Sequence, residues 1–206
     1  MAKKYYELFD KIQSVVNGKD ILDIGCVDHK ASQSKGSLWV HAFLKKHAKH
    51  LLGIDISKKE VEILKQKGYN VDFGDAENFK FNKKFEIIFA GELIEHLSNQ
   101  GKFLENCKNN LKKEGVLILT TPSSFNLQEN IKNVLFMKTD PAVNNQHTCY
   151  YTPTTIKQLI ERHGFIVDKI DFFDFYGSFF GKIKFKILSL FGDIFKRRMV
   201  IYSKLK

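Results

Sequence analysis

The chain has 206 residues, of which 43% are hydrophobic and 27% are charged. These totals are typical of one soluble globular domain and exclude a repetitive or low-complexity chain. Three scattered cysteines, Cys26, Cys107 and Cys149, are too few for a disulfide framework or a zinc cluster, which favours a reducing compartment. The first residues hold no continuous apolar stretch, so we expect neither a signal peptide nor a membrane anchor, and a cytoplasmic protein.

The net charge of +10 is concentrated near the C-terminal end. Residues 182–206 contain eight basic side chains and one acidic side chain, in a segment rich in Phe and Ile. A nucleic-acid-binding protein more often carries its basic residues around the active cleft. The charge distribution therefore does not favour nucleic acid as the partner.

Apolar runs of strand length alternate with segments of helical periodicity. Strands are expected, in chain order, at 21–24, 51–56, 69–73, 85–90 and 116–121. Between them, apolar residues spaced by three and four predict helices at 37–48, 58–68 and 101–113. Strands that are apolar nearly throughout and separated by helices predict a parallel sheet covered on both faces, which is a doubly wound α/β domain.

This alternation ends at Pro122. Residues 123–150 are polar, rich in Asn and weakly periodic, and we expect an irregular segment or lid over the carboxyl edge of the sheet. A helix is then expected over 153–164, followed by strands at 165–173 and 198–205. The chain is thus expected to form one domain over 1–206.

Four successive strand ends carry glycine or an acid. The first strand ends at Asp23 and Gly25, the second at Asp55, the third is followed by Asp75, and the fourth by Gly91 and Glu92. A turn glycine or a solvated acid explains each feature alone. In open α/β sheets, however, ligands bind beyond the carboxyl ends of the strands, so the set predicts a ligand site.

Five motifs follow one another in a recognisable order: ILDIGC, GIDIS, GDAENF, FEIIFAGELIEHL and GVLILTTP. Residues 21–122, which contain them, resemble the core of class I S-adenosylmethionine-dependent methyltransferases. The stretch HTCYYTPTTIKQLIERHGF is similar to the substrate-side segment of members linked to cell-surface polysaccharide or lipid-linked sugar modification. The resemblance implies a Rossmann-like, mostly parallel seven-stranded sheet with an antiparallel last strand and helices on both faces.

The resemblance also assigns cofactor contacts to S-adenosylmethionine. Asp55 would hold the ribose hydroxyls. Asp75 would accept from the adenine amino group while the backbone N–H of Ala76 donates to the ring. Gly25 would let the backbone pass close to the methionine part, and Asp23 would order that turn or reach the ammonium through water. The expected set is completed by Cys26, Ile56 and Gly91.

The turn after Gly25 departs from the pattern, because Val27, Asp28 and His29 stand where a second glycine is expected. Gly25 and Asp55 are 30 residues apart, against about 20 in the dinucleotide fingerprint. The inserted loop either rebuilds a wall of the cofactor site or signals weakened binding. We favour the first interpretation, since S-adenosylmethionine has no phosphate that needs the second glycine, and the ribose and adenine positions are intact.

Residues 92–97, ELIEHL, carry the candidate catalytic groups. A helix that begins near Glu92 would place Glu92, Glu95 and His96 on one face, with His147 arriving from the lid. Together they would form a Mg²⁺ or other divalent site, as in ubiquinone-pathway O-methyltransferases and small-RNA 2′-O-methyltransferases, which this segment resembles. Alternatively, Glu92 favours the helix N-terminus and the others join a loop network. Without a metal, His96 or His147 would act as the general base.

Two further histidines, His41 and His163, are expected in helices away from the sheet edge, in structural or exposed positions. Residues 177–197 are expected to form an amphipathic insert, with lysines opposite an apolar stripe. Through 179–198 it would contact an anionic membrane; a homodimer contact and packing on the sheet are the alternatives.

The sequence thus predicts O-methylation of a small-molecule or glycan-like acceptor with S-adenosylmethionine as cofactor. RNA ribose 2′-O-methylation and a non-catalytic nucleoside-binding scaffold are the alternatives, the second because the glycine turn is altered.

Overall fold

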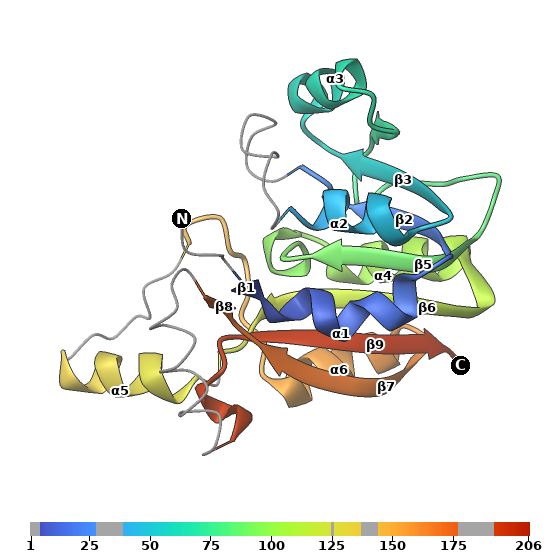
Figure 1. Ribbon diagram of the computed structural model, residues 1–206. Helices are drawn as coiled ribbons and strands as arrows, with labels where there is room; N and C mark the ends of the chain where they lie inside the picture. Colours follow the sequence, from blue (N-terminus) through green and yellow to red (C-terminus); the bar gives the residue numbers. More distant parts are fainter. Residues whose placement is uncertain (1–4, 28–38, 125, 137–143, 177–191) are drawn as a thin grey trace.

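A computed structural model describes residues 5–27, 39–124, 126–136, 144–176 and 192–206. Its centre is a seven-stranded sheet in which only β9 runs against the other strands (Figure 1), as the resemblance implies. A two-stranded pair, β1 (Tyr5–Tyr6) with β8 (Phe175–Tyr176), lies apart from it. The sheet order is β4 (Val71–Phe73), β3 (His50–Asp55), β2 (Asp20–Ile24), β5 (Phe85–Gly91), β6 (Leu111–Pro122), β9 (Arg198–Leu205) and β7 (Phe165–Phe173).

Helices cover both faces of this sheet (Figure 1). One face carries α1 (Glu7–Val16) and α2 (Val40–His47), and the other carries α4 (Gln100–Asn110) and α6 (Pro153–Arg162). The remaining helices are α3 (Lys58–Gln66), α5 (Leu127–Leu135) and two short 3₁₀ turns, η1 (Ile94–His96) and η2 (Asp193–Phe195). Among the described residues, no helix combines the length and apolar character needed to cross a bilayer.

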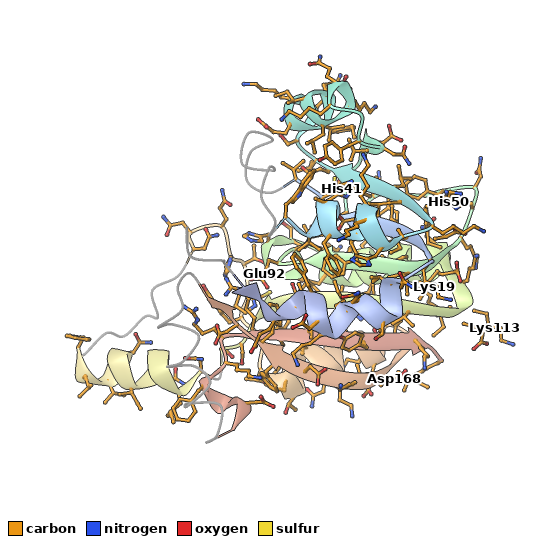
Figure 2. The ribbon with its side chains drawn as sticks, in the orientation of Figure 1. Lys19, His41, His50, Glu92, Lys113 and Asp168 are labelled. Carbon is orange, nitrogen blue, oxygen red and sulfur yellow. The ribbon has the colours of Figure 1, made fainter. Side chains whose placement is uncertain are left out.

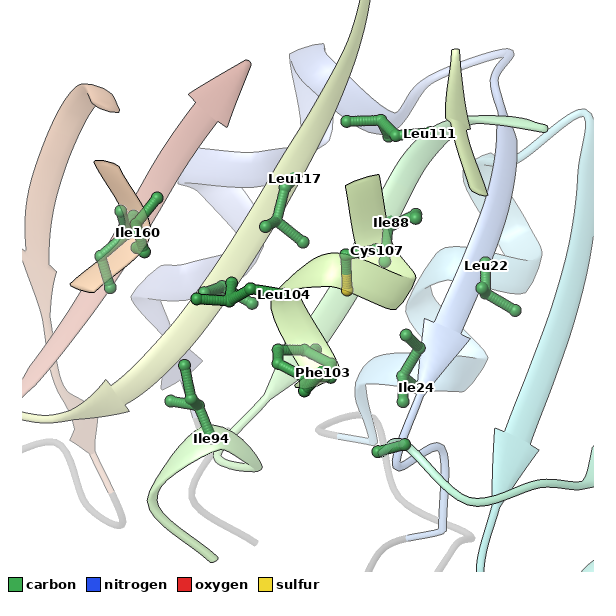
Figure 3. Close-up of a cluster of buried hydrophobic side chains, with 14 of the residues drawn as sticks. Leu22, Ile24, Ile88, Ile94, Phe103, Leu104, Cys107, Leu111, Leu117 and Ile160 are labelled. Carbon is green, nitrogen blue, oxygen red and sulfur yellow. The ribbon is translucent and has the colours of Figure 1, made fainter. Parts of the chain in front are cut away.

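Alternation along the strands divides the core into two layers. Leu22 and Ile24 pack with α4 on one face, in the cluster of Figure 3, whereas Ile21 packs with α1 and α2 on the other. Phe103 and Leu104 of α4 are fully buried. Both faces of the strands are thus apolar because both are covered, as the sequence predicts.

The register of the parallel strands determines where the loops meet. Ile24 at the end of β2 pairs with Ile54 of β3 on one side and with Ala90 of β5 on the other. These strands therefore end at the same edge of the sheet, and the residues that follow them are brought together there.

The region 123–150 differs from its prediction, because α5 forms within it. Its apolar residues Leu127, Ile131, Val134 and Leu135 have helical spacing, which the surrounding asparagines obscure. The exposed fractions of Val134 and Phe136 are 78% and 70%. Most of the predicted insert, residues 177–191, lies outside the described part of the chain.

Candidate active site

A cavity of about 560 Å³ opens at the carboxyl ends of β2, β3, β5 and β6. It is walled by the strand ends, by the start of α2 and by η1. The residues predicted from the sequence that line it are Asp23, Gly25, Cys26, Asp55, Gly91, Glu92 and His96. The structure therefore brings together the strand-end residues of the first, second and fourth predicted strands.

The Asp55 carboxylate is fixed by two backbone N–H groups at the cavity wall. Val27 donates to Oδ2 over 3.1 Å, and Ser57 donates to Oδ1 over 2.9 Å. Burial raises the pKa of Asp55, against the lowering effect of these two hydrogen bonds. Because a carboxylate oxygen has two lone pairs and can accept more than one hydrogen bond, Asp55 keeps acceptor sites for a ligand.

Side chains hold Cys26 and Val27, the described part of the altered turn after β2. Gly25 has a φ of +75°, a left-handed conformation that glycine adopts without strain. The indole Nε1–H of Trp39 donates to the carbonyl oxygen of Cys26 over 2.9 Å, and Val27 is bound to Asp55. The described part of the turn is thus held by the wall of the cavity itself.

His41 is not where we expected it. It lies in the first turn of α2, lines the cavity, and its Nδ1 is 2.8 Å from Oδ2 of Asp23 (Figure 2 labels His41). The exposed fractions of His41 and Asp23 are 1% and 3%. The prediction placed His41 away from the sheet edge, because nothing in the sequence indicates that the helix after the inserted loop packs over β2. His163, by contrast, is the C-cap of α6, and its Nδ1 is bound to the carbonyl oxygen of Leu159.

Other predicted cofactor contacts follow the ends of β3 and β4 and do not line this cavity. Ile56 follows Asp55 directly and its side chain is 67% exposed. Asp75 follows β4, and its Oδ1 accepts from the N–H of Glu77 over 2.8 Å. Ala76 is buried beside it. Their roles in cofactor binding stay predictions.

Glu92 precedes the 3₁₀ turn and is not part of a helix, so the predicted shared helical face is wrong. Its backbone has a φ of +50°. The N–H donates to the carbonyl oxygen of Thr120, and the carboxylate accepts from the hydroxyl of Thr120 and from Nε of Arg198, over 3.2 and 3.0 Å. These contacts hold Glu92 at the cavity.

Glu95 is a buried carboxyl group. The hydroxyl of Thr121 donates to its Oε2 over 3.0 Å, whereas Oε1 is buried and has no partner among the described residues. Burial, followed by the negative charge of Glu92, raises the pKa of Glu95 to about 8. A neutral carboxyl group is therefore favoured at this position near neutral pH.

The two predicted catalytic histidines meet beside Glu95. The ring centroids of His96 and His147 are 4.6 Å apart, and Nδ1 of His96 is 3.1 Å from the carbonyl oxygen of Gln146. Nδ1 of His147 is buried without a partner in the described residues. One ligand atom from each of Glu95, His96 and His147 lies within 4.8 Å of the others. The predicted cluster therefore forms without Glu92.

Some site residues were missed by the sequence analysis. Trp39 and His41 gave no local signal, because their contacts depend on how α2 returns to the sheet. Thr120 and Thr121 did give a signal, since two hydroxyl residues end an otherwise apolar strand at the edge where the other strands carry acids.

Comparison with known proteins agrees with this geometry. A family model described as a methyltransferase domain matches residues 1–170. The chain belongs to this methyltransferase family. The predicted superfamily, the class I S-adenosylmethionine-dependent methyltransferases, is thereby confirmed.

The relatives of this methyltransferase include the ubiquinone biosynthesis O-methyltransferase of Pelagibacter ubique, which is 25% identical over 75% of the chain and 65% of its own length. The malonyl-[acyl-carrier protein] O-methyltransferase of Haemophilus influenzae is 28% identical over 54% of the chain and 44% of its own length. The methyltransferase chain thus spans about half to two thirds of the length of these curated relatives.

Solved structures share the fold of this methyltransferase. A methyltransferase from Archaeoglobus fulgidus aligns with a TM-score of 0.66 and 17% identity, over 96% of this chain and 93% of its own. Magnesium protoporphyrin IX methyltransferase from Synechocystis, solved with bound SAH, aligns with a TM-score of 0.63 and 12% identity, over 97% and 83%.

Proposed function

We propose that the protein transfers a methyl group from S-adenosylmethionine to an oxygen atom of a small-molecule or glycan-like acceptor. The observation that carries this proposal is Asp55, held at the cavity wall with free acceptor sites and next to the Gly25 turn. The two named relatives are O-methyltransferases, which supports oxygen as the acceptor atom.

The residues present fit the cofactor. The cavity volume of about 560 Å³ falls within the range typical of small-molecule sites. Asp55 would accept from the two ribose hydroxyls, which need a fixed acceptor for a bidentate contact. A methyl group added at Gly25 would lie 3.3 Å from Cδ1 of Leu93, so the glycine keeps this wall open. Asp75 and the N–H of Ala76 are the proposed adenine contacts.

His96 is the proposed general base. A carbonyl oxygen only accepts hydrogen bonds, so the contact with Gln146 places the proton of His96 on Nδ1 and leaves Nε2 as the acceptor. Bound S-adenosylmethionine supplies a methyl group activated by the positive sulfur. Nε2 of His96 takes the proton of the acceptor hydroxyl. At the same time the hydroxyl oxygen bonds to that methyl group and the sulfur–methyl bond breaks.

A divalent ion is the alternative at the same position. Oε1 of Glu95 and Nδ1 of His147, for which the described residues offer no partner, favour it, because buried polar atoms are normally bonded. Glu95, His96 and His147 would hold the ion, which would lower the pKa of the acceptor hydroxyl. Activity measured with and without a chelator distinguishes the two: loss that Mg²⁺ restores supports the ion, and unchanged activity supports His96 alone.

The first prediction tests the cofactor site. Asp55→Ala removes the proposed ribose contact and should abolish binding of S-adenosylhomocysteine measured by calorimetry, since two hydrogen bonds to a charged group are lost. Asp72→Ala is the matched control, because Asp72 lies on the neighbouring strand with an exposed side chain paired to Lys65. Equal affinity of Asp55→Ala and the wild type would contradict the assignment.

The cellular surroundings are part of the proposal as well. We propose a cytoplasmic protein whose segment 179–198 contacts an anionic membrane that carries the acceptor. Flotation with vesicles that contain anionic lipid tests this contact. Recovery of all the protein in the bottom fraction of the gradient, apart from the vesicles, would exclude membrane binding. A homodimer through the same segment is the alternative, which sedimentation velocity would detect.

A further inference from the structure

The pair formed by Asp23 and His41 is the most deeply buried polar contact of the cavity wall. Nδ1 of His41 lies 2.8 Å from Oδ2 of Asp23, and both side chains are almost fully shielded from bulk solvent. Burying a carboxylate and an imidazole is costly unless each is well partnered. Apolar side chains would pack α2 on β2 without this cost in desolvation free energy, so packing alone does not explain the pair.

The position of the ring is closely determined. A methyl group added at Gly53 would lie 2.7 Å from Cε1 of His41 and 2.7 Å from Sγ of Cys26, so β3 accepts only glycine beneath the pair. Trp39 and Tyr69 have ring centroids 5.2 and 5.9 Å from that of His41. Because Nδ1 is taken by Asp23, any polar contact of His41 with a ligand in the cavity must use Nε2.

The charges around the cavity restrict what that contact can be. The other ionisable side chains along its wall include three acids, Asp23, Asp55 and Glu92, and one further imidazole, His96. His96 lies beside Glu95 and His147, at the proposed acceptor side. Among the ionisable side chains of the described cavity wall, His41 is the one near the end of β2 that can donate to an anionic group of a ligand.

We propose that His41, protonated on both ring nitrogens, donates from Nδ1 to Asp23 and from Nε2 to the carboxylate of the amino-acid end of the cofactor, while the free acceptor sites of Asp23 face the ammonium; this inference rests on the proposed function. A zwitterion needs an acceptor and a donor side by side, and the Asp23–His41 pair supplies both. The N-terminal N–H groups of α2, where Trp39 provides no side-chain cap, add partial positive charge at the same place. The Asp23–His41 pair thus binds the amino-acid part of the cofactor, next to the turn where a second glycine is missing.

The test compares S-adenosylhomocysteine with its decarboxylated analogue, which keeps the amine, on the full chain. His41→Asn keeps an N–H donor near the position of Nδ1 and removes Nε2. We expect calorimetry to show that this variant binds S-adenosylhomocysteine roughly tenfold or more weakly, as for a lost hydrogen bond to a charged group, and the decarboxylated analogue within about twofold of the wild type.

The chain offers a matched control in His50, whose Nδ1 lies 2.7 Å from Oδ1 of Asp20. This second pair is exposed and lies at the opposite edge of the sheet, as Figure 2 shows for His50 and Glu92. His50→Asn should leave both affinities unchanged. His41→Gln carries an amide N–H toward the position of Nε2 and should restore part of the preference for the carboxylate.

Three outcomes would overturn the inference. Equal losses for both ligands in His41→Asn would show that His41 only supports the fold of the site, and an unchanged affinity for S-adenosylhomocysteine would show that Nε2 makes no contact. A wild type that prefers neither ligand over the other would exclude a carboxylate contact altogether. Failure of the wild type to bind any nucleoside would instead reject the proposed function, and the inference with it.

Discussion

The carbonyl oxygen of Gln146 accepts the Nδ1–H of His96 and so decides which ring nitrogen can remove a proton. His147 has a different electrostatic environment, because burial, followed by the neighbouring His96, lowers its pKa. At the scale of single residues, the two imidazoles that the sequence could not separate therefore receive different roles. His96 lines the cavity, and His147 lies beside Glu95 and His96.

The second prediction concerns His96. His96→Asn keeps a donor toward Gln146 but removes Nε2, so we expect kcat to fall about 10²- to 10⁴-fold with little change in affinity for S-adenosylhomocysteine. Single-turnover assays and calorimetry measure the two quantities. His163→Asn is the control, because its Nδ1 also bonds a backbone carbonyl, in α6 and away from the site. A kcat equal to that of the wild type would exclude His96 as the base.

At the scale of elements, Thr148 joins the 144–152 segment to η1. Its N–H donates to the carbonyl oxygen of Glu95 over 2.7 Å, and its hydroxyl lies within hydrogen-bonding distance of the carbonyl oxygens of Glu95 and Leu97, at 3.0 and 2.8 Å. These contacts fix His147 and Gln146 beside His96. Two elements 50 residues apart thus form one rigid side of the cavity.

The third prediction tests this connection. Thr148→Val keeps the shape of the side chain but removes the hydroxyl donor that the carbonyl oxygens of Glu95 and Leu97 share, and leaves them their other donors. We expect kcat to fall about tenfold because His96 loses its fixed ring orientation, with cofactor affinity unchanged. Thr154→Val, at an exposed position of α6, should behave as the wild type. Equal kcat values for the two variants would show that the segment is positioned by other contacts.

The elements that the sequence predicted correctly share a physical cause. Strands buried on both faces leave continuous apolar runs, so β2, β3, β5 and β9 were located within one or two residues. Residues at their carboxyl ends, such as Asp55 and Glu92, were found because the topology alone brings them together. The pairing of His41 with Asp23 was not predicted, because it depends on tertiary packing across an inserted loop.

At the scale of the whole molecule, the buried Glu95 carboxyl makes the stability of the fold depend on pH. In the folded state its pKa is raised from 4.5 to about 8. Between these values the folded state binds more protons than the unfolded state, so the free energy of unfolding falls as the pH rises through this window. A shift of this kind corresponds to a few kcal/mol of destabilisation at the alkaline end.

The fourth prediction follows from this linkage. Glu95→Gln cannot ionise, so we expect its free energy of unfolding to vary less between the two ends of the window than that of the wild type. Urea denaturation in the presence of a chelator measures the difference. Glu105→Gln, an exposed change on α4, should retain the dependence of the wild type. Identical pH profiles for Glu95→Gln and the wild type would show that the carboxyl is not the cause.

The left-handed backbone at Glu92 has a consequence for protein engineering. A side chain at a φ of +50° costs on the order of 1 kcal/mol, which glycine would relieve. Glycine would also lose the contacts of the Glu92 carboxylate with Thr120 and Arg198, so its effect on heat resistance is the difference between the two contributions. A glycine variant selected for heat resistance would lack the carboxylate that faces the cavity, so libraries of this methyltransferase should be screened for turnover and thermostability together.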